Sequence, residues 1–237
     1  MRYDNITEGR FISRPNRFIA QVSINGTHET VHVKNTGRCR ELLVPDGKVY
    51  LSGPYPPPRK TAYDLVAVEK VTENGSVLIN MDSQAPNKAA EEWLLTGELF
   101  GNDAQVRREY TWGDSRFDLF ITTGERRIFM EVKGVTLEKQ GIAMFPDAPT
   151  VRGVKHIREL IRAVDCGYEA YLLFVIQMKG ITGFTPDTAT HPEFASALSD
   201  AVNAGVRVLA YDCSVTPDSM TIDAPVRVMT EKFLKST

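Results

Sequence analysis

The sequence lacks the features by which membrane and secreted proteins are recognised. No apolar run approaches the roughly 20 residues that a membrane-spanning helix needs. The first residues include Asp4 and Glu8 among scattered arginines, a pattern unlike that of a signal peptide. We therefore expect a soluble, cytoplasmic protein that has no membrane partner.

The chain is also poor in the side chains that bind soft metals. Its three cysteines are widely spaced and form no C-x-x-C pair, and its four histidines do not have the spacing of zinc ligands. This argues against a disulfide framework and a zinc site, so the cysteines are expected to be reduced. Any bound metal should be a hard cation held by oxygen atoms.

The net charge of −2 is small but unevenly distributed. Residues 1–80 carry 11 Lys and Arg against 8 Asp and Glu, whereas the remainder carries 17 against 22. A surplus of this size is common on solvated surfaces and does not by itself indicate nucleic-acid binding. The clustering of the basic residues matters more than their total.

Two different periodicities divide the chain. Up to about residue 83, short β-type runs alternate with turn signals such as Asn25-Gly26 and Asp46-Gly47. Five such runs and no helical period predict a small barrel of the OB type in residues 1–83. The predicted strands are 18–24, 29–33, 48–51, 64–68 and 76–80.

From Pro86 a helical period begins, and the Pro86-Asn87 pair is expected to cap this helix. The later pattern alternates strands and helices with short connections, which predicts crossovers and a partly parallel sheet. Residues 84–237 should therefore form an α/β domain with a mixed sheet, and the whole chain a two-domain α+β protein. The predicted elements are an antiparallel hairpin of strands 115–122 and 127–133, a Gly- and Pro-rich loop 134–150, a helix that follows this loop and ends at Gly167 with Val154, Ile157, Ile161 and Val164 on one face, a helix over 192–204, and strands 171–176 and 206–211.

The predicted hairpin carries two acids and a lysine. Glu131 and Lys133 are two residues apart and so share one face of their strand, and Asp118 can reach that face from the neighbouring strand. Asp118 and Glu131 are candidate ligands for Mg or Mn, and Lys133 can contact a phosphate or orient a water. We also consider Glu92, on the preceding helix, as a further catalytic acid.

A simpler reading of this cluster is a solvated strand surface, because Glu-x-Lys arises by chance about once in a chain of this length at average composition. The neighbouring Ile128, Phe129 and Met130 favour the centre of a sheet instead. An acid buried there needs a partner or a metal.

Basic residues recur beside aromatic ones in the first domain. They also form a stripe on the helix that follows the loop 134–150. This mixture suits phosphate contact with base stacking, although the same residues also fit an ordinary turn and a solvated helix face. The candidate DNA-binding residues are Arg14, Arg17, Asn35, Thr36, Arg38, Arg40, Arg59, Lys60, Arg152, Lys155 and Arg158.

Several motifs, taken together and in order, closely resemble the sugar fermentation stimulation protein family, SfsA. They are Asn35-Thr36-Gly37-Arg38 with Leu42-Leu43, Ser115-Arg116-x-Asp118, Glu131-Val132-Lys133-x-Val135-Thr136-Leu137, Phe145-Pro146-Asp147-Ala148-Pro149-Thr150, and Arg152-Gly153-x-Lys155-His156-x-Arg158-Glu159-Leu160.

The resemblance implies an N-terminal OB-fold, a C-terminal domain like the PD-(D/E)XK nucleases, and DNA binding without strong sequence preference. It also implies a role in regulating sugar metabolism, especially that of maltose. By position, Asp118, Glu131 and Lys133 fall on the nuclease-like motif, and Glu91 or Glu92 falls near the helix acid. Three departures are Phe117 in place of proline, and Gly134 and Val154 where we expect Ser and Arg in many relatives.

Three functions remain open at this point. The first is a DNA-binding protein with a Mg-dependent nuclease domain. The second is a DNA-binding regulator whose nuclease-like site is structural or unused. The third is a sugar-binding protein, which is disfavoured because the first domain is richer in cations than in aromatic platforms. The preferred nucleic acid and the oligomeric state, a homodimer included, are also left open.

Overall fold

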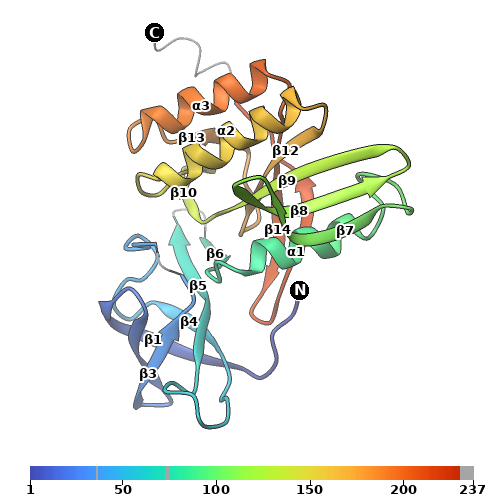
Figure 1. Ribbon diagram of the computed structural model, residues 1–237. Helices are drawn as coiled ribbons and strands as arrows, with labels where there is room; N and C mark the ends of the chain where they lie inside the picture. Colours follow the sequence, from blue (N-terminus) through green and yellow to red (C-terminus); the bar gives the residue numbers. More distant parts are fainter. Residues whose placement is uncertain (36, 73–74, 230–237) are drawn as a thin grey trace.

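The computed structural model describes residues 1–35, 37–72 and 75–229 of the chain. The described residues form two sheet-rich domains and contain three α-helices, all of them in the second domain (Figure 1). Among these residues, no helix has the length and apolar character needed to cross a membrane.

The described part of the first domain contains six strands, one more than the sequence predicted. The sheet has the order β3-β2-β1-β4-β5-β6, and β3 also pairs with β5 through His32–Asp64 and Val33–Leu65. The missed strand is β1, in which only Gly9 and Phe11 are buried, so it lacks an apolar alternation. The bounds are β1 (Ile6–Asn16), β2 (Ile19–Ile24), β3 (Thr27–Val33), β4 (Lys48–Ser52), β5 (Asp64–Thr72) and β6 (Gly75–Asn80).

The second domain is built on a mixed sheet of order β15-β14-β12-β9-β8-β7. Its centre is β12, whose apolar residues are buried on both faces and which runs parallel to β9 and β14. The predicted hairpin of β8 and β9 is antiparallel, as expected. The bounds are β7 (Gln105–Trp112), β8 (Ser115–Thr123), β9 (Arg126–Val135), β12 (Glu169–Ile176), β14 (Arg207–Thr216) and β15 (Ser219–Pro225).

A second, small sheet occupies part of the segment that we predicted as a loop. The expectation of a loop over 134–150 was wrong, because β10 (Leu137–Lys139) and β11 (Ile142–Phe145) pair within it. The third strand is β13 (Gly183–Pro186), which runs parallel to β11. Strands of three or four residues are too short to show a recognisable alternation in sequence.

The helices cover both faces of the large sheet. Helix α1 (Ala85–Leu94) packs Trp93 and Leu94 against one face, and α2 (Val151–Asp165) and α3 (Pro192–Asn203) lie side by side over the other (Figure 1). The N-cap of α1 is Gln84, so Asn87 lies inside the first turn and not at the cap that we predicted. Its side chain is therefore available to the sheet.

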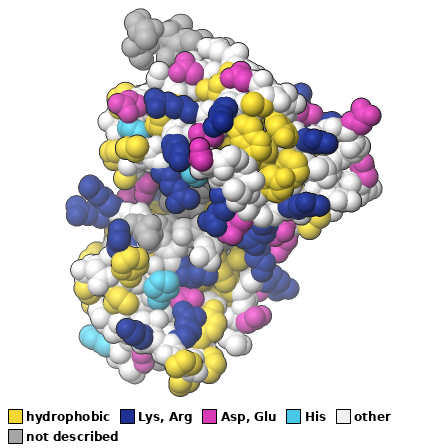
Figure 2. All heavy atoms as spheres, in the orientation of Figure 1, with side chains coloured by type: hydrophobic (Ala, Val, Ile, Leu, Met, Phe, Trp, Pro, Cys, Tyr) yellow, Lys and Arg dark blue, Asp and Glu magenta, His cyan; other side chains and the backbone are white. Residues whose placement is uncertain are grey.

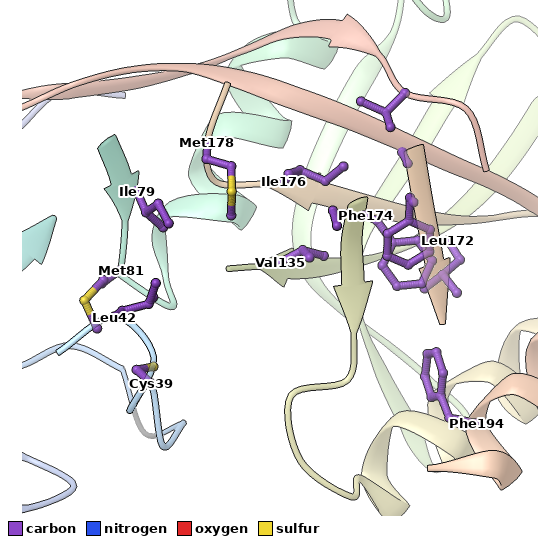
Figure 3. Packing of buried hydrophobic residues seen from close by; sticks show 14 of the residues in the cluster. Cys39, Leu42, Ile79, Met81, Val135, Leu172, Phe174, Ile176, Met178 and Phe194 are labelled. Atoms are coloured by element: carbon purple, nitrogen blue, oxygen red, sulfur yellow. The ribbon is translucent and has the colours of Figure 1, made fainter. Parts of the chain in front are cut away.

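The two domains share one hydrophobic core. Leu42, Ile79 and Met81 of the first domain belong to the same buried cluster as Ile176 and Met178 of the second (Figure 3). Beside this contact, the buried side chain of Gln177 places Nε2 3.0 Å from the carbonyl oxygen of Asn80 and 3.1 Å from that of Asp82. The backbone N–H of Asn80 in turn donates to the Gln177 carbonyl at 2.9 Å. The domains are thus joined by packing and by hydrogen bonds.

We predict that Gln177→Ala lowers the free energy of unfolding by about 2–4 kcal/mol, because it leaves buried carbonyl groups without a donor. Gln105→Ala, an exposed position on the edge strand β7, is the matched control and should change stability by less than about 0.5 kcal/mol. Urea unfolding of both variants measures the difference. Equal midpoints would show that Gln177 does not join the domains.

Candidate functional site

The site lies where strands β8 and β9 separate. Their pairing runs from Thr123–Arg126 to Leu119–Met130. One residue beyond its end, the backbone N–H of Val132 donates to Oδ2 of Asp118 at 2.9 Å. The other oxygen, Oδ1, accepts from Nδ2 of Asn87 at 2.9 Å. Where the two strands separate, the Asp118 carboxylate thus accepts the hydrogen bond that a backbone carbonyl of β8 would otherwise accept. Asn87 of α1 holds the carboxylate in this position.

Glu131 is the most deeply buried charge at this point, with 1% of its surface exposed. Its Oε1 accepts from Nζ of Lys133 at 2.6 Å and contacts Nδ1 of His156 on α2. Its Oε2 is buried and has no hydrogen-bond partner among the described residues. A buried carboxylate oxygen without a hydrogen-bond partner destabilises the folded state, because no protein group replaces the water molecules that it loses on burial.

The two carboxyl groups have opposite pKa shifts. Burial, and then the nearby charge of Glu131, raise the pKa of Asp118 above its ordinary value. Burial also acts to raise the pKa of Glu131, but the hydrogen bond from His156 and the positive charge of Lys133 outweigh it, and the pKa of Glu131 is lowered. Glu131 is therefore held ionised, and its charge makes the ionised form of Asp118 less favourable.

His156 and Asn87 were not identified from the sequence. His156 Nδ1 lies 3.4 Å from Nζ of Lys133, and its Nε2 lies 3.3 Å from Nε of Arg152, one helical turn earlier. In the sequence His156 falls within the basic stripe, and Asn87 looked like a helix cap. One feature of the sequence could have indicated that His156 faces the sheet. It lies between Val154 and Ile157, two buried residues of α2, and so at the edge of the buried face of this helix.

The structure does not bring Glu92 to this site. Its carboxylate lies 2.5 Å from the amino group of Met1, and the carboxylate of Glu91 lies 3.6 Å from the guanidinium of Arg108. Within the part of the chain that the structure describes, no group of three or more His, Cys, Asp or Glu side chains is arranged to hold a metal ion. The carboxylates gathered at the hairpin are Asp118 and Glu131.

Two of the candidate DNA-binding arginines, Arg14 and Arg59, are held by polar contacts within the first domain. The guanidinium of Arg14 donates to the backbone carbonyls of Arg17, Asn35, Gly37 and Arg38 at 2.6–2.8 Å, so it fixes the loop after β3. Arg59 lies 2.5 Å from Asp64 and stacks over Tyr55.

The remaining candidates are mostly exposed. On the first domain the exposed candidates are Arg17, Arg38, Arg40 and Lys60, and Arg17 lies over the Phe18 ring. On α2 they are Arg152, Lys155 and Arg158. Asn35 is half-buried, and Thr36 lies outside the described residues. Figure 2 shows Lys and Arg side chains gathered around the hollow between the two lobes of the molecule.

Two departures noted in the sequence have a steric explanation in this chain. A Cβ atom at Gly134 would lie 2.5 Å from Oε1 of Gln177 and 2.7 Å from Cγ of Pro86, which leaves no room for serine. Val154 is buried in the shared core, where an arginine would be unpaired.

Comparison with known proteins agrees with this architecture of an OB domain followed by a sheet-rich domain. Residues 12–80 match the model of the SfsA N-terminal OB domain, and residues 84–219 match that of the sugar fermentation stimulation protein RE domain. The chain therefore belongs to the sugar fermentation stimulation protein family, SfsA.

Individual relatives cover nearly the whole chain. The sugar fermentation stimulation protein homolog of Desulfitobacterium hafniense (strain DSM 10664 / DCB-2) is 56% identical over 220 residues, which are 93% of this chain and 94% of the relative. The homolog of Ruminiclostridium cellulolyticum is 52% identical over 228 residues, which are 96% and 99% of the two chains. The solved structure of Pyrococcus furiosus SfsA in complex with Ca²⁺ superposes with a TM-score of 0.83 at 28% identity, and covers 96% of this chain and 97% of the other.

We predict that Asp118→Asn raises the melting temperature at neutral pH in metal-free buffer. The raised pKa of Asp118 means that its ionised form destabilises the fold above that pKa. The gain should shrink as the pH falls and vanish below about 3.9, where Asp118 is protonated in the unfolded chain as well. Thermal unfolding of both proteins between pH 3 and 8 tests this, and a constant difference across the range would contradict it.

Proposed function

We propose that this protein binds nucleic acid without strong sequence preference and that its second domain is a PD-(D/E)XK-like nuclease domain, in which Asp118 and Glu131 bind Mg or Mn. The observation that carries the proposal is the buried Oε2 of Glu131, which lacks a partner among the described residues. A cation would supply the missing interaction and reduce the repulsion that raises the pKa of Asp118.

The donor set suits a hard cation. Both proposed ligands are carboxylates, and oxygen donors are the ones that Mg²⁺, Mn²⁺ and Ca²⁺ prefer. Pyrococcus furiosus SfsA, which is similar over nearly its whole length, was solved with Ca²⁺. That complex supports a divalent cation in this family, and we extend it to Asp118 and Glu131 of this chain.

The surrounding side chains have defined tasks in phosphodiester hydrolysis. When bound, the metal would lower the pKa of a coordinated water and neutralise charge on the phosphate. Lys133, whose Nζ lies 2.6 Å from Oε1 of Glu131, would contact the scissile phosphate. His156 holds Oε1 and thereby leaves Oε2 for the metal, and Asn87 fixes Asp118 from α1.

Nucleic acid would be held by its phosphates. Lys155 and Arg158 are exposed on α2, the helix that also carries His156, and Arg38, Arg40 and Lys60 are exposed on the first domain. Cations on both domains suit a backbone that passes between them. The relatives are named for sugar fermentation. We therefore propose that, by binding DNA, this protein regulates sugar metabolism, that of maltose in particular.

A specific observation also favours the alternative of a non-catalytic DNA-binding regulator. Glu92, which we considered as a further catalytic acid, instead forms an ion pair with the amino group of Met1. Among the described contacts, it makes none with Asp118 or Glu131. Two carboxylates can bind a metal, but a third would hold it more firmly in a catalytic geometry. In this alternative the site binds metal, and DNA is bound without turnover.

We predict that wild-type protein binds Mn²⁺ by calorimetry and cleaves DNA in its presence, and that Glu131→Gln lowers cleavage at least about 100-fold because the buried charge is lost. Glu125→Gln, in the exposed hairpin turn, removes the same charge away from the site and should behave as the wild type. Circular dichroism verifies that each variant is folded.

The same experiment separates the candidates. Metal binding with cleavage that Glu131→Gln abolishes supports the nuclease, whereas metal and DNA binding without cleavage by any protein supports the regulator. If wild type binds neither Mn²⁺ nor DNA, both are wrong.

We predict that the double variant Lys155→Ala/Arg158→Ala binds duplex DNA more weakly and with a salt dependence shallower by about 2 in the log–log slope, since each lost phosphate contact removes about 0.9. The control is Arg2→Ala/Lys179→Ala, which removes two charges that already pair with Asp218 and with Asp212 and Asp223. Fluorescence anisotropy between about 50 and 200 mM salt gives both slopes. Equal slopes for the two variants would exclude α2 from the DNA contact.

A further inference from the structure

A small cavity lies between the two domains, with a volume of about 210 Å³. Two motifs that are far apart in the sequence meet there, the loop at Asn35 and Gly37 and the segment at Phe145 and Asp147. They lie close together, because a Cβ atom on Gly37 would come within 2.7 Å of Oδ2 of Asp147. The function proposed above gives this cavity no role.

The cavity begins next to the candidate metal site. Gly134, Val135 and Thr136, which line it, directly follow Lys133 along the chain. The wall of the cavity thus continues the strand that carries Glu131 and Lys133. Burial raises the pKa of the lining carboxylate of Asp147, and hydrogen bonds from the backbone N–H groups of Asp147 and Ala148 and the charge of Arg38 act against this rise. Arg38 is also suited to an adjoining phosphate.

The lining offers hydrogen-bond acceptors. Gln177 has 2% of its surface exposed, and its Nε2 is committed to the carbonyls of Asn80 and Asp82. Its Oε1 accepts no hydrogen bond from any described residue and points toward Gly134 at the cavity wall. The Asp147 carboxylate adds a second acceptor, and the Thr136 hydroxyl can donate or accept. Phe145 borders the cavity, and its ring packs on those of Phe174 and Phe194.

The size of the cavity limits what can enter it. Pockets for drug-sized ligands usually measure about 300–1,000 Å³, so this one suits a smaller, flat group. A duplex, whose major groove alone is about 12 Å wide, cannot enter. A single base that is unpaired or turned out of the stack can, and enzymes that act on nucleic acids commonly hold such a base by hydrogen bonds and aromatic contact.

We propose that the cavity lined by Asn35, Thr136, Phe145, Asp147 and Gln177 receives one unpaired nucleobase that carries an exocyclic amino group, adjacent to the phosphate at the metal site. The inference rests on the proposed function and narrows it to single-stranded or locally unpaired nucleic acid. Cytosine N4 and adenine N6 donate to acceptors such as the Gln177 and Asp147 oxygens, and a carboxylate is a known partner of cytosine N4. Thymine has a carbonyl oxygen at the corresponding place.

The test compares binding of 15-nucleotide oligo-dC and oligo-dT by fluorescence anisotropy with Ca²⁺ as the metal. Wild type should bind oligo-dC about tenfold more tightly, the discrimination that one good base contact provides. Asp147→Asn should bring the ratio close to one, because an amide can donate to thymine O4 as well as accept from cytosine N4. Asp114→Asn, in the exposed turn between β7 and β8, removes the same charge and should keep the preference.

Thr136→Val, which keeps the volume and removes the hydroxyl, provides a second variant; it should weaken the preference for oligo-dC, and circular dichroism verifies that it is folded. Equal binding of the two oligonucleotides by wild type, or an unchanged preference in Asp147→Asn, overturns the base cavity while DNA binding itself stands. Failure of wild type to bind any oligonucleotide overturns the proposed function, and the two failures are therefore distinguishable.

Discussion

The burial of the Glu131 charge is the constraint on which the arrangement of the second domain depends. A carboxylate at the centre of a sheet needs compensation, and each neighbouring element provides part of it. Strand β9 supplies Lys133 two residues later, and α2 places His156 against the same oxygen. Strand β8 turns away from β9 at Asp118, whose carboxylate then accepts the N–H of Val132. What remains uncompensated is one carboxylate oxygen, and this residual cost is the strongest physical argument for a bound cation.

The second constraint is the shared core, which fixes the first domain relative to the site. Met81 and Leu42 meet Met178 and Ile176 in one apolar cluster, and Gln177 hydrogen-bonds to the chain that links the domains. The loop at Asn35 is consequently held over the segment that follows Lys133. Arg14 adds to this, because its guanidinium holds that loop through the backbone carbonyls of Asn35 and Gly37. Basic residues on the two domains therefore face one hollow without belonging to one stretch of sequence.

Much of the framework could be predicted from the sequence, because long elements carry strong periodicity. The apolar β12, the helices α2 and α3 and the β8–β9 hairpin were all foreseen. Strand β1 was not, since nearly all of its residues are polar or half-exposed, and β10 and β11 are too short to show a period. The pairing of Glu131 with Lys133 follows from alternation within one strand. The contacts of Asn87, His156 and Glu92 depend on how helices are rotated against the sheet, which a single sequence does not encode locally.

The continuity of the hydrophobic core across the domain boundary also bears on how the family can evolve. Two domains joined by a flexible linker can be separated, exchanged or fused to other partners, because each keeps its own buried surface. Here Ile79 and Met81 on one side and Val135 and Met178 on the other would be exposed by separation (Figure 3). An OB domain is a module that recurs widely, yet in this protein its buried surface is continuous with that of the second domain. Selection therefore acts on the pair, and each substitution at the junction in one domain must be accommodated by the other.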